Sequence, residues 1–349
     1  MRALLRVLRS ALPSIGALGS AAAGGLLWPV TPATRPDFAP PRTPGRESWV
    51  SSTGGARLRV VTYGPEEAQP FVFAHGWTCD AQVWLPQVHA LAEKYRVITY
   101  DQRGHLRSTL GDEPFRVEFL GDDLAAVLAA TLRAGERAVI AGHSMGGMSI
   151  MAWALHHPEQ VQERASAVVL TATGAHGLLG KATIPFLGSG TRLTSLLAGA
   201  AVFPLALPLP MNFSVVRKSA AARFIVRNIV LSPEADDAAT DLTTAMAFRC
   251  PPDARAACIK ALTKSLDVRA GLRNLTVPTV VVAGGQDYMT PVAHSYEMAD
   301  VLAETGWLER LVVFPGSGHM VALEATEEYN ALLAEIAEKS AKAFVEAGR

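Results

Sequence analysis

The 349-residue sequence is poor in cysteine and in charge. Its three cysteines are too few to hold a fold together by disulfides, and their spacing is not that of a zinc site. Charged residues make up only 18% of the chain, and Lys+Arg equals Asp+Glu at 32 each, so no overall field attracts nucleic acid. Because disordered chains are polar and highly charged, the 49% hydrophobic content indicates a large globular protein.

Acidic residues are absent from positions 1–36. Three arginines lie within the first nine residues, and an uncharged run follows from Ala11 to Val30, about the length that spans a bilayer. Glycine and proline interrupt this run, and Ala outnumbers Leu in it. A signal peptide, a membrane anchor and a flexible leader of a cytoplasmic enzyme all stay open. Five prolines between residues 32 and 44 then predict a linker.

From residue 47 onward, short apolar segments alternate with helical patterns. The apolar segments are rich in Val and Ile, as in parallel strands that are buried on both faces. We expect strands at 60–63, 71–74, 97–100, 138–141, 167–170, 277–283 and 311–314. We expect helices near 83–94, 116–133, 145–157, 292–305 and 321–346. This alternation predicts an α/β fold with a doubly wound, mostly parallel sheet.

Residues 175–270 interrupt the alternation with prolines among many Ala and Leu. We interpret this stretch as a helical cap (lid) inserted into a core made of 47–174 and 271–349, preceded by the leader and linker of 1–46. Apolar residues of the cap would line an apolar pocket: Ile184, Phe186, Leu196, Leu197, Phe203, Leu205, Leu207 and Leu209.

The cap sequence is also basic, because no Asp or Glu but seven Lys and Arg occur between Arg164 and Pro233. Within it, residues 213–231 mix Arg and Lys with apolar side chains. Such a helix suits docking on an anionic membrane surface. It equally suits a helix that packs on the core and leaves a basic edge in solvent, and we favour this second interpretation.

The strongest chemical signal is a G-x-S-x-G pattern at residues 142–146, Gly-His-Ser-Met-Gly. It lies between an expected strand and an expected helix. A serine hydroxyl needs an exposed position and a base to become a nucleophile, and a sharp strand-to-helix turn supplies the exposure. The flanking glycines remove side chains that would clash in this turn. The pattern therefore predicts that Ser144 is the nucleophile of an enzyme.

A second signal follows the strand at 71–74, where the sequence reads His75-Gly76-Trp77. A tetrahedral intermediate needs N–H donors aimed at its developing oxyanion. Gly76 permits a close turn, so we expect the N–H groups of Trp77 and Met145 to form an oxyanion hole. We expect His75 to brace the loop and not to transfer protons.

Two further candidates follow late strands. Asp287 comes after Gly284-Gly285-Gln286, and His319 comes after Gly316-Ser317-Gly318. Open α/β sheets place their ligands outside the carboxyl ends of the strands. Of the nine histidines, only His319 combines the order Ser…Asp…His with a loop between strand and helix. These positions predict a triad of Ser144, Asp287 and His319.

Over roughly residues 55–345, the chain resembles serine hydrolases of the α/β-hydrolase fold, with the cap inserted after the sixth strand. Residues 101–108 resemble the family's D-x-R-G-x-G-x-S loop and depart from it at Leu106, where glycine is usual. The resemblance implies that His319 takes the proton of Ser144 and that Asp287 orients the imidazole. It also implies a small-molecule ester as substrate, and neither a metal nor an organic cofactor.

Several functions share these residues. Hydrolysis of carboxylic esters by a lipase- or esterase-like enzyme is the leading hypothesis, and the apolar residues of the cap would then line its acyl pocket. The motifs also resemble cofactor-free haloperoxidases, which form peracids, and carbon–carbon bond hydrolases. Epoxide hydrolases and haloalkane dehalogenases need an aspartate where Ser144 stands. A ligand-binding protein of this fold is the non-enzyme alternative. The sequence leaves the oligomeric state and any membrane contact open.

Overall fold

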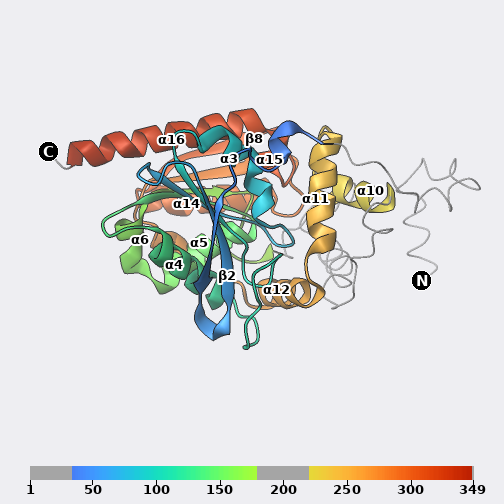
Figure 1. Ribbon diagram of the computed structural model, residues 1–349, viewed down its shortest axis with the longest axis horizontal. Helices are drawn as coiled ribbons and strands as arrows, with labels where there is room; N and C mark the ends of the chain where they lie inside the picture. The colour runs from blue at the N-terminus through green and yellow to red at the C-terminus, as the bar shows by residue number, and fades with distance from the viewer. Residues whose placement is uncertain (1–33, 179–219, 348–349) are drawn as a thin grey trace, which may run out of the picture.

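An eight-stranded sheet forms the centre of the computed structural model, which describes residues 34–178 and 220–347 (Figure 1). The strands are β1 (Arg46–Ser51), β2 (Arg57–Tyr63), β3 (Pro70–Ala74), β4 (Arg96–Tyr100), β5 (Ala138–His143), β6 (Ala165–Thr171), β7 (Thr279–Gly284) and β8 (Leu308–Phe314). Their order across the sheet is β1-β2-β4-β3-β5-β6-β7-β8. β2 runs antiparallel to β1 and β4, and all neighbours from β4 to β8 are parallel. The predicted α/β fold is confirmed.

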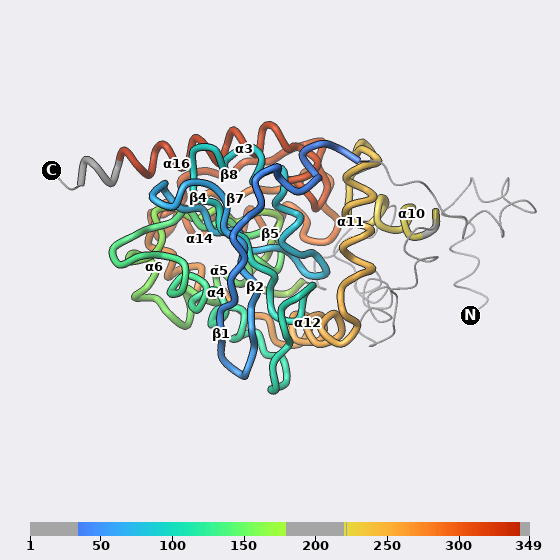
Figure 2. Tube along the Cα trace, viewed as in Figure 1, coloured from blue at the N-terminus to red at the C-terminus, as the bar shows by residue number. Residues whose placement is uncertain are grey.

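All seven expected strands are present, and the sequence pattern missed only β1. This edge strand has the sequence RESWVS, and Val50 is its one buried residue. It lacks an apolar run, and it forms the border of the sheet beside β2 (Figure 2). β7 begins at Thr279 and not at Val277, because Pro278 has no N–H to donate to the ladder.

Helices cover both faces of the sheet. One face carries α4 (Glu118–Thr131), α5 (Met145–His156), α13 (Arg269–Arg273) and α14 (Val292–Glu304), and the other carries α3 (Leu85–Leu91) and α16 (Thr326–Ala347). Shorter elements are α6 (Pro158–Arg164), α15 (Val321–Glu324) and 3-10 helices at Pro36–Phe38, Thr53–Gly55 and Ala81–Trp84. Side chains of one strand alternate between the two cores, so that Phe71 and Phe73 face α3 and α16 while Val72 and Ala74 face α4 and α5.

Between β6 and β7 the described chain contains α10 (Ala220–Ile229), α11 (Asp237–Arg249) and α12 (Pro252–Ser265). These helices gather at one end of the molecule, opposite the C-terminal end of α16 (Figure 1). The two ends of the insertion meet, because His176 and Asp267 form an isolated bridge and Val268 N–H donates to the Ala175 carbonyl at 2.9 Å. The division into leader, core and cap remains a prediction, and the apolar residues expected to line an acyl pocket lie outside the described residues.

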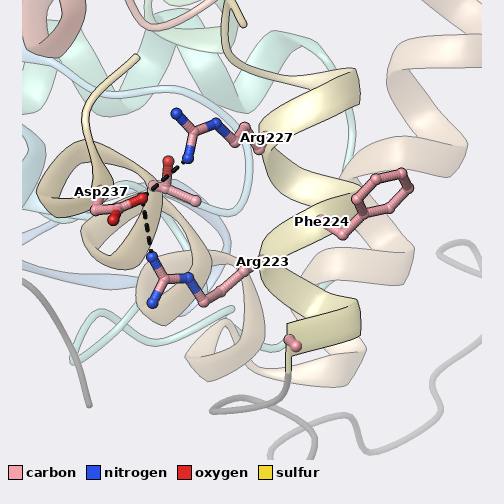
Figure 3. Close-up of a pocket in the computed structure, with 6 residues that line it drawn as sticks. Arg223, Phe224, Arg227 and Asp237 are labelled. Atoms are coloured by element: carbon pink, nitrogen blue, oxygen red, sulfur yellow. Dashed lines mark hydrogen bonds and ion pairs between the residues drawn. The ribbon is translucent and has the colours of Figure 1, made fainter. Parts of the chain in front are cut away.

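The basic edge of α10 faces acidic side chains of α11. Asp237 accepts from Arg227 at 2.9 Å and from Arg223 at 3.1 Å, and Phe224 points away from them on the other side of the helix (Figure 3). Asp241 also pairs with Arg223, at 3.2 Å. Arg223, Phe224, Arg227 and Asp237 border a hollow of about 330 Å³. The two arginines are thus paired with α11 and not left in solvent, which differs from the basic edge expected from the sequence. The apolar side chains of Phe224, Ile225 and Ile229 on the same helix are exposed, and both interpretations of this helix stay predictions.

The uncharged run of the N-terminus lies outside the described residues. In the part of the chain that the structure does describe, no helix combines the length and the apolar character that a membrane crossing requires.

Candidate active site

Ser144 occupies the turn between β5 and α5. Its φ of 53° and ψ of −117° lie in a region that L-residues rarely adopt, at a cost of about 1–3 kcal/mol. Surrounding hydrogen bonds hold it there. Its N–H donates to the Thr171 carbonyl at 2.9 Å, and its carbonyl accepts from the Thr173 hydroxyl at 2.7 Å and from two N–H groups of α5 at 2.9 and 3.2 Å. The turn therefore fixes the serine backbone before any substrate binds.

The glycines on either side of Ser144 are required by close backbone contacts. A Cβ on Gly142 would lie 2.4 Å from the Gly146 carbonyl oxygen, and a Cβ on Gly146 would lie 2.0 Å from the Ala74 carbonyl oxygen. Both distances are shorter than real Cβ contacts allow. The expected role of the two glycines is thus confirmed, and Gly146 also packs α5 tightly against the end of β3.

Asp287 and His319 are hydrogen-bonded to each other. The aspartate follows β7 and the histidine follows β8, and these strands are parallel neighbours, so both residues lie at the same edge of the sheet. His319 Nδ1 lies 2.8 Å from Asp287 Oδ2, and the residues are only 3% and 5% exposed. Because a carboxylate oxygen accepts this bond, Nδ1 is its donor, and Nε2 is the ring nitrogen left to accept a proton.

Three further donors hold the Asp287 carboxylate. Its Oδ1 accepts the N–H groups of Met289 at 2.8 Å and of Thr290 at 2.9 Å. The Thr290 hydroxyl donates to Oδ2 at 2.8 Å and lies 3.3 Å from His319 Nδ1. These bonds replace the water that a buried carboxylate loses. Thr290 therefore touches both members of the pair, a role that the sequence analysis missed.

Ser144 is brought beside this pair through its neighbour His143. The His143 ring donates from Nε2 to the carbonyl oxygen of His319 at 2.9 Å, and the two ring centroids are 4.8 Å apart. Burial lowers the pKa of His143 well below its usual value, which keeps the ring neutral. Within residues 34–178 and 220–347, no hydrogen bond joins Ser144 Oγ to His319 Nε2. The serine and the histidine loop are nevertheless neighbours at one sheet edge.

The two predicted oxyanion donors, the N–H groups of Trp77 and Met145, belong to segments that adjoin Ser144. Gly76 packs on the serine turn, because a Cβ placed there would lie 3.2 Å from the Ser144 Cβ. Met145 N–H belongs to the first residue of α5, and such groups lack an intrahelical partner. Among the described residues, neither Met145 N–H nor Trp77 N–H donates to a protein acceptor. The Trp77 ring is fixed separately, since its Nε1 donates to the Arg255 carbonyl of α12 at 3.1 Å.

His75 braces the same loop. Its Nε2 accepts the N–H of Gln102 at 2.8 Å, and its Nδ1 donates to the Gly76 carbonyl at 2.7 Å. Burial lowers the pKa of His75 to about 4, so the ring is neutral near pH 7. Both ring nitrogens are engaged with backbone groups, which agrees with the bracing role expected from the sequence.

The cysteines take no visible part in the site. Cys79, Cys250 and Cys258 are all free and buried. Burial raises the pKa of each thiol, that of Cys250 to about 12, so the reactive thiolate is scarce near pH 7. Over the described ranges, no three His, Cys, Asp or Glu side chains come together as a metal site requires.

A sequence model described as the alpha/beta hydrolase family matches residues 71–332. The chain belongs to the alpha/beta hydrolase family. The match begins in β3 and ends in α16, so it contains every candidate site residue named above.

Relatives within the alpha/beta hydrolases differ in their reactions. The chain is 29% identical to 3-oxoadipate enol-lactonase 2 of Acinetobacter baylyi, over 68% of this chain and 78% of that protein. It is 27% identical to the non-heme chloroperoxidase of Burkholderia pyrrocinia, over 78% of this chain and 92% of that protein. Among solved structures, an esterase from Exiguobacterium antarcticum aligns with a TM-score of 0.66 and 20% identity, over 84% of this chain and all of that one. This last likeness shows the fold alone.

Proposed function

We propose that this alpha/beta hydrolase cleaves carboxylic esters, with Ser144 as the nucleophile, His319 as the general base and Asp287 as the group that orients the base. The observation that carries the proposal is the 2.8 Å bond between His319 Nδ1 and Asp287 Oδ2, made at the sheet edge where Ser144 occupies its strained turn. That bond leaves His319 Nε2 as the only ring nitrogen able to accept a proton.

In this proposal, the chemistry begins when Ser144 Oγ attacks the acyl carbonyl carbon. His319 Nε2 takes the hydroxyl proton, and Asp287 stabilises the imidazolium that forms. The N–H groups of Trp77 and Met145 donate to the oxyanion, and one such donor is worth about 2.7–4 kcal/mol in the transition state. His319 then gives its proton to the leaving alcohol, which leaves an acyl ester on Ser144. The serine and histidine hydrogen bond forms as the substrate binds, since catalytic contacts often tighten only in the complex.

Water completes the cycle by attacking the acyl-enzyme with His319 again as base. Hydrogen peroxide in place of water would release a peracid and regenerate the Ser144 hydroxyl. Perhydrolysis is therefore the second candidate, favoured by the likeness to a chloroperoxidase over nearly the whole length of that relative. The likeness to an enol-lactonase favours cyclic esters among the substrates.

We also propose that the insertion acts as a cap over the site. Its helices bond to loops on two sides of Ser144. Arg249 of α11 pairs at 2.5 Å with Asp80, which lies three residues after Trp77. The Trp77 ring donates to the carbonyl of Arg255 in α12. On the other side, His319 N–H donates at 2.8 Å to the carbonyl of Val230, the residue that follows α10. A cap held at both sides would shield the acyl-enzyme from bulk water.

A fluorophosphonate probe tests the nucleophile. The native chain should be labelled covalently, and Ser144→Ala should not be labelled. Ser149→Ala is the matched control, because this serine lies on α5 just beyond the turn and its hydroxyl is bonded to Gln102 at 2.7 Å. Absence of labelling in the native chain, or unchanged labelling of Ser144→Ala, would favour the ligand-binding alternative.

A substrate screen tests the reaction class. p-Nitrophenyl esters from acetate to palmitate, a lactone and an anilide should be compared, each with and without hydrogen peroxide. Ester and lactone turnover well above the anilide is the expected result. Peracid formation that exceeds hydrolysis would place perhydrolysis first.

A further inference from the structure

The Glu324 carboxylate binds three backbone N–H groups from two separate parts of the chain. Glu324 is the last residue of α15 and is half-buried. Its Oε2 accepts from Gly318 at 3.0 Å and from Ser232 at 2.7 Å, and its Oε1 accepts from Met320 at 3.0 Å. Gly318 and Met320 flank His319, whereas Ser232 lies in the insertion. One side chain thus joins both sides of the histidine to the chain leaving α10.

The same two segments touch directly. His319 N–H donates to the Val230 carbonyl at 2.8 Å. A Cβ on Gly318 would lie 2.5 Å from the Leu231 carbonyl carbon and 2.6 Å from the Ser232 nitrogen, so only glycine permits this approach. Leu231 and Ser232 are each 1% exposed. The three consecutive N–H groups of residues 318–320 are therefore all bound by Glu324 or by the insertion.

We infer that Glu324 is a positioning residue that couples the placement of the insertion to the placement of the His319 imidazole. This inference rests on the proposed function of His319 as the general base. The imidazole follows its own backbone, so displacement of residues 230–232 would shift Nε2 relative to Ser144 Oγ. A misplacement of about 1 Å at a catalytic group can cost roughly 100-fold in rate.

As a consequence, the position of the insertion would control the alignment of the His319 imidazole. With the insertion seated, three hydrogen bonds hold the N–H groups of residues 318–320, a fourth joins Ser232 to Glu324, and the base is aligned. When the insertion lifts at the end of α10, two hydrogen bonds are lost together, His319 N–H to the Val230 carbonyl and Ser232 N–H to Glu324. The His319 imidazole then loses its alignment. Glu324 thereby makes productive geometry depend on a closed insertion.

Glu324→Gln is the primary variant. An amide has one acceptor oxygen, and its NH₂ group must face at least one of the three backbone N–H groups. Glu328→Gln is the matched control, because it makes the same change of charge at an exposed residue of the neighbouring helix α16. Glu324→Asp is the second variant if the first does not fold, since it keeps the charge but is one methylene too short to bridge both segments.

Two readouts are combined. Amide hydrogen exchange measures peptides covering residues 228–236 and 315–321, and ester hydrolysis gives kcat and KM separately. In Glu324→Gln we expect exchange to rise about fivefold or more in both peptides, and kcat to fall about tenfold or more while KM changes less than about threefold. Glu324→Asp should change both readouts in the same direction, and Glu328→Gln should change neither.

The inference is overturned if exchange rises in only one of the two peptides, if kcat stays within about twofold of the native value while exchange rises, or if Glu328→Gln has the same effects. The exchange measurement uses no substrate. A native protein that neither reacts with the probe nor cleaves esters would overturn the proposed function, and the exchange comparison would still decide whether Glu324 joins the insertion to the histidine loop.

Discussion

His105 Nε2 accepts the backbone N–H of Thr78 at 3.2 Å. Thr78 follows Trp77, and its φ of 62° is unusual for a residue other than glycine. The His105 ring donates from Nδ1 to the Arg103 carbonyl at 3.0 Å, so its tautomer suits acceptance at Nε2. The 101–108 loop, which the sequence linked to the family only by its motif, thus supports the segment proposed to bind the oxyanion.

The burial of His105 and His75 makes the free energy of unfolding depend on pH. Burial lowers the pKa of His105 to about 3 and that of His75 to about 4, against about 6.5 in the unfolded chain. Below pH 6.5 the unfolded chain therefore binds more protons than the folded chain, and the free energy of unfolding falls as pH falls. Each histidine should remove about 2 kcal/mol between pH 7 and pH 5. Urea denaturation at both pH values measures the loss.

His105→Gln tests how much of that loss of unfolding free energy comes from His105. Its side-chain oxygen can accept the Thr78 N–H but does not titrate. We expect the loss of stability between pH 7 and pH 5 to shrink by about 2 kcal/mol. An unchanged loss would mean that His105 does not resist protonation in the folded state.

Leu106 stands where the family loop usually has glycine, and its φ is 45°. An L-residue in this region is strained by about 1–2 kcal/mol, whereas glycine is not. We expect Leu106→Gly to be more stable than Leu106→Ala by about 1 kcal/mol in chemical denaturation. At Ala125, inside α4, replacement by glycine should instead destabilise by about 1 kcal/mol. A higher stability for Leu106→Ala would contradict the left-handed backbone at this position.

His319→Ala removes the proposed base. Ester turnover should fall by roughly four to six orders of magnitude, because the Ser144 hydroxyl then lacks a proton acceptor. Circular dichroism should show native secondary structure. His89→Ala, on the exposed surface of α3, is the control and should retain turnover. Retention of activity by His319→Ala would remove this histidine from the mechanism.

Asp287→Asn keeps the shape of the side chain but can donate to His319 Nδ1. The ring then adopts the wrong tautomer, and we expect kcat to fall about 10⁴-fold. Steady-state kinetics with a p-nitrophenyl ester measures the loss. A nearly normal rate would show that another carboxylate orients the histidine.

Thr290→Val removes one of the four donors to Asp287 without changing the side-chain shape. The loss of a hydrogen bond to a charged group is worth about 1.5–3 kcal/mol, so kcat should fall about tenfold or more. Thr290→Ser keeps the hydroxyl and should stay within about threefold of the native kcat. Equal rates for the Val and Ser variants would rule out a contribution of the hydroxyl.

Much of the fold was predictable because its strands have a local signal. β3 to β7 are almost entirely buried, and their apolar sequences identify them without knowledge of their neighbours. β8 lies at the border of the sheet and is half-buried, but it still carries an apolar run at residues 311–314. β1 carried no such signal, since its pairing with β2 depends on a contact between segments and not on its own sequence. The glycines at 142 and 146 were predictable for a similar reason, because a sharp turn constrains its own residues.

The side-chain partners could not be predicted in the same way. Arg223 and Arg227 looked like a free basic edge in sequence, yet Asp237 and Asp241 lie within reach once α10 packs on α11. Glu324 carried no motif. Of its three donors, Ser232 is 92 positions away along the chain, whereas Gly318 and Met320 are six and four positions away.

The sequence by itself determined which residues we propose for the chemistry and at which edge of the sheet they lie, because the G-x-S-x-G turn and the Ser…Asp…His order are properties of the chain. Tertiary structure alone decided that His319 meets Asp287, that Thr290 and His143 hold this pair, and that the insertion reaches the histidine loop through Glu324. Those contacts depend on strand register and on the packing of distant segments, and such long-range geometry leaves no periodic trace in the residues that make it.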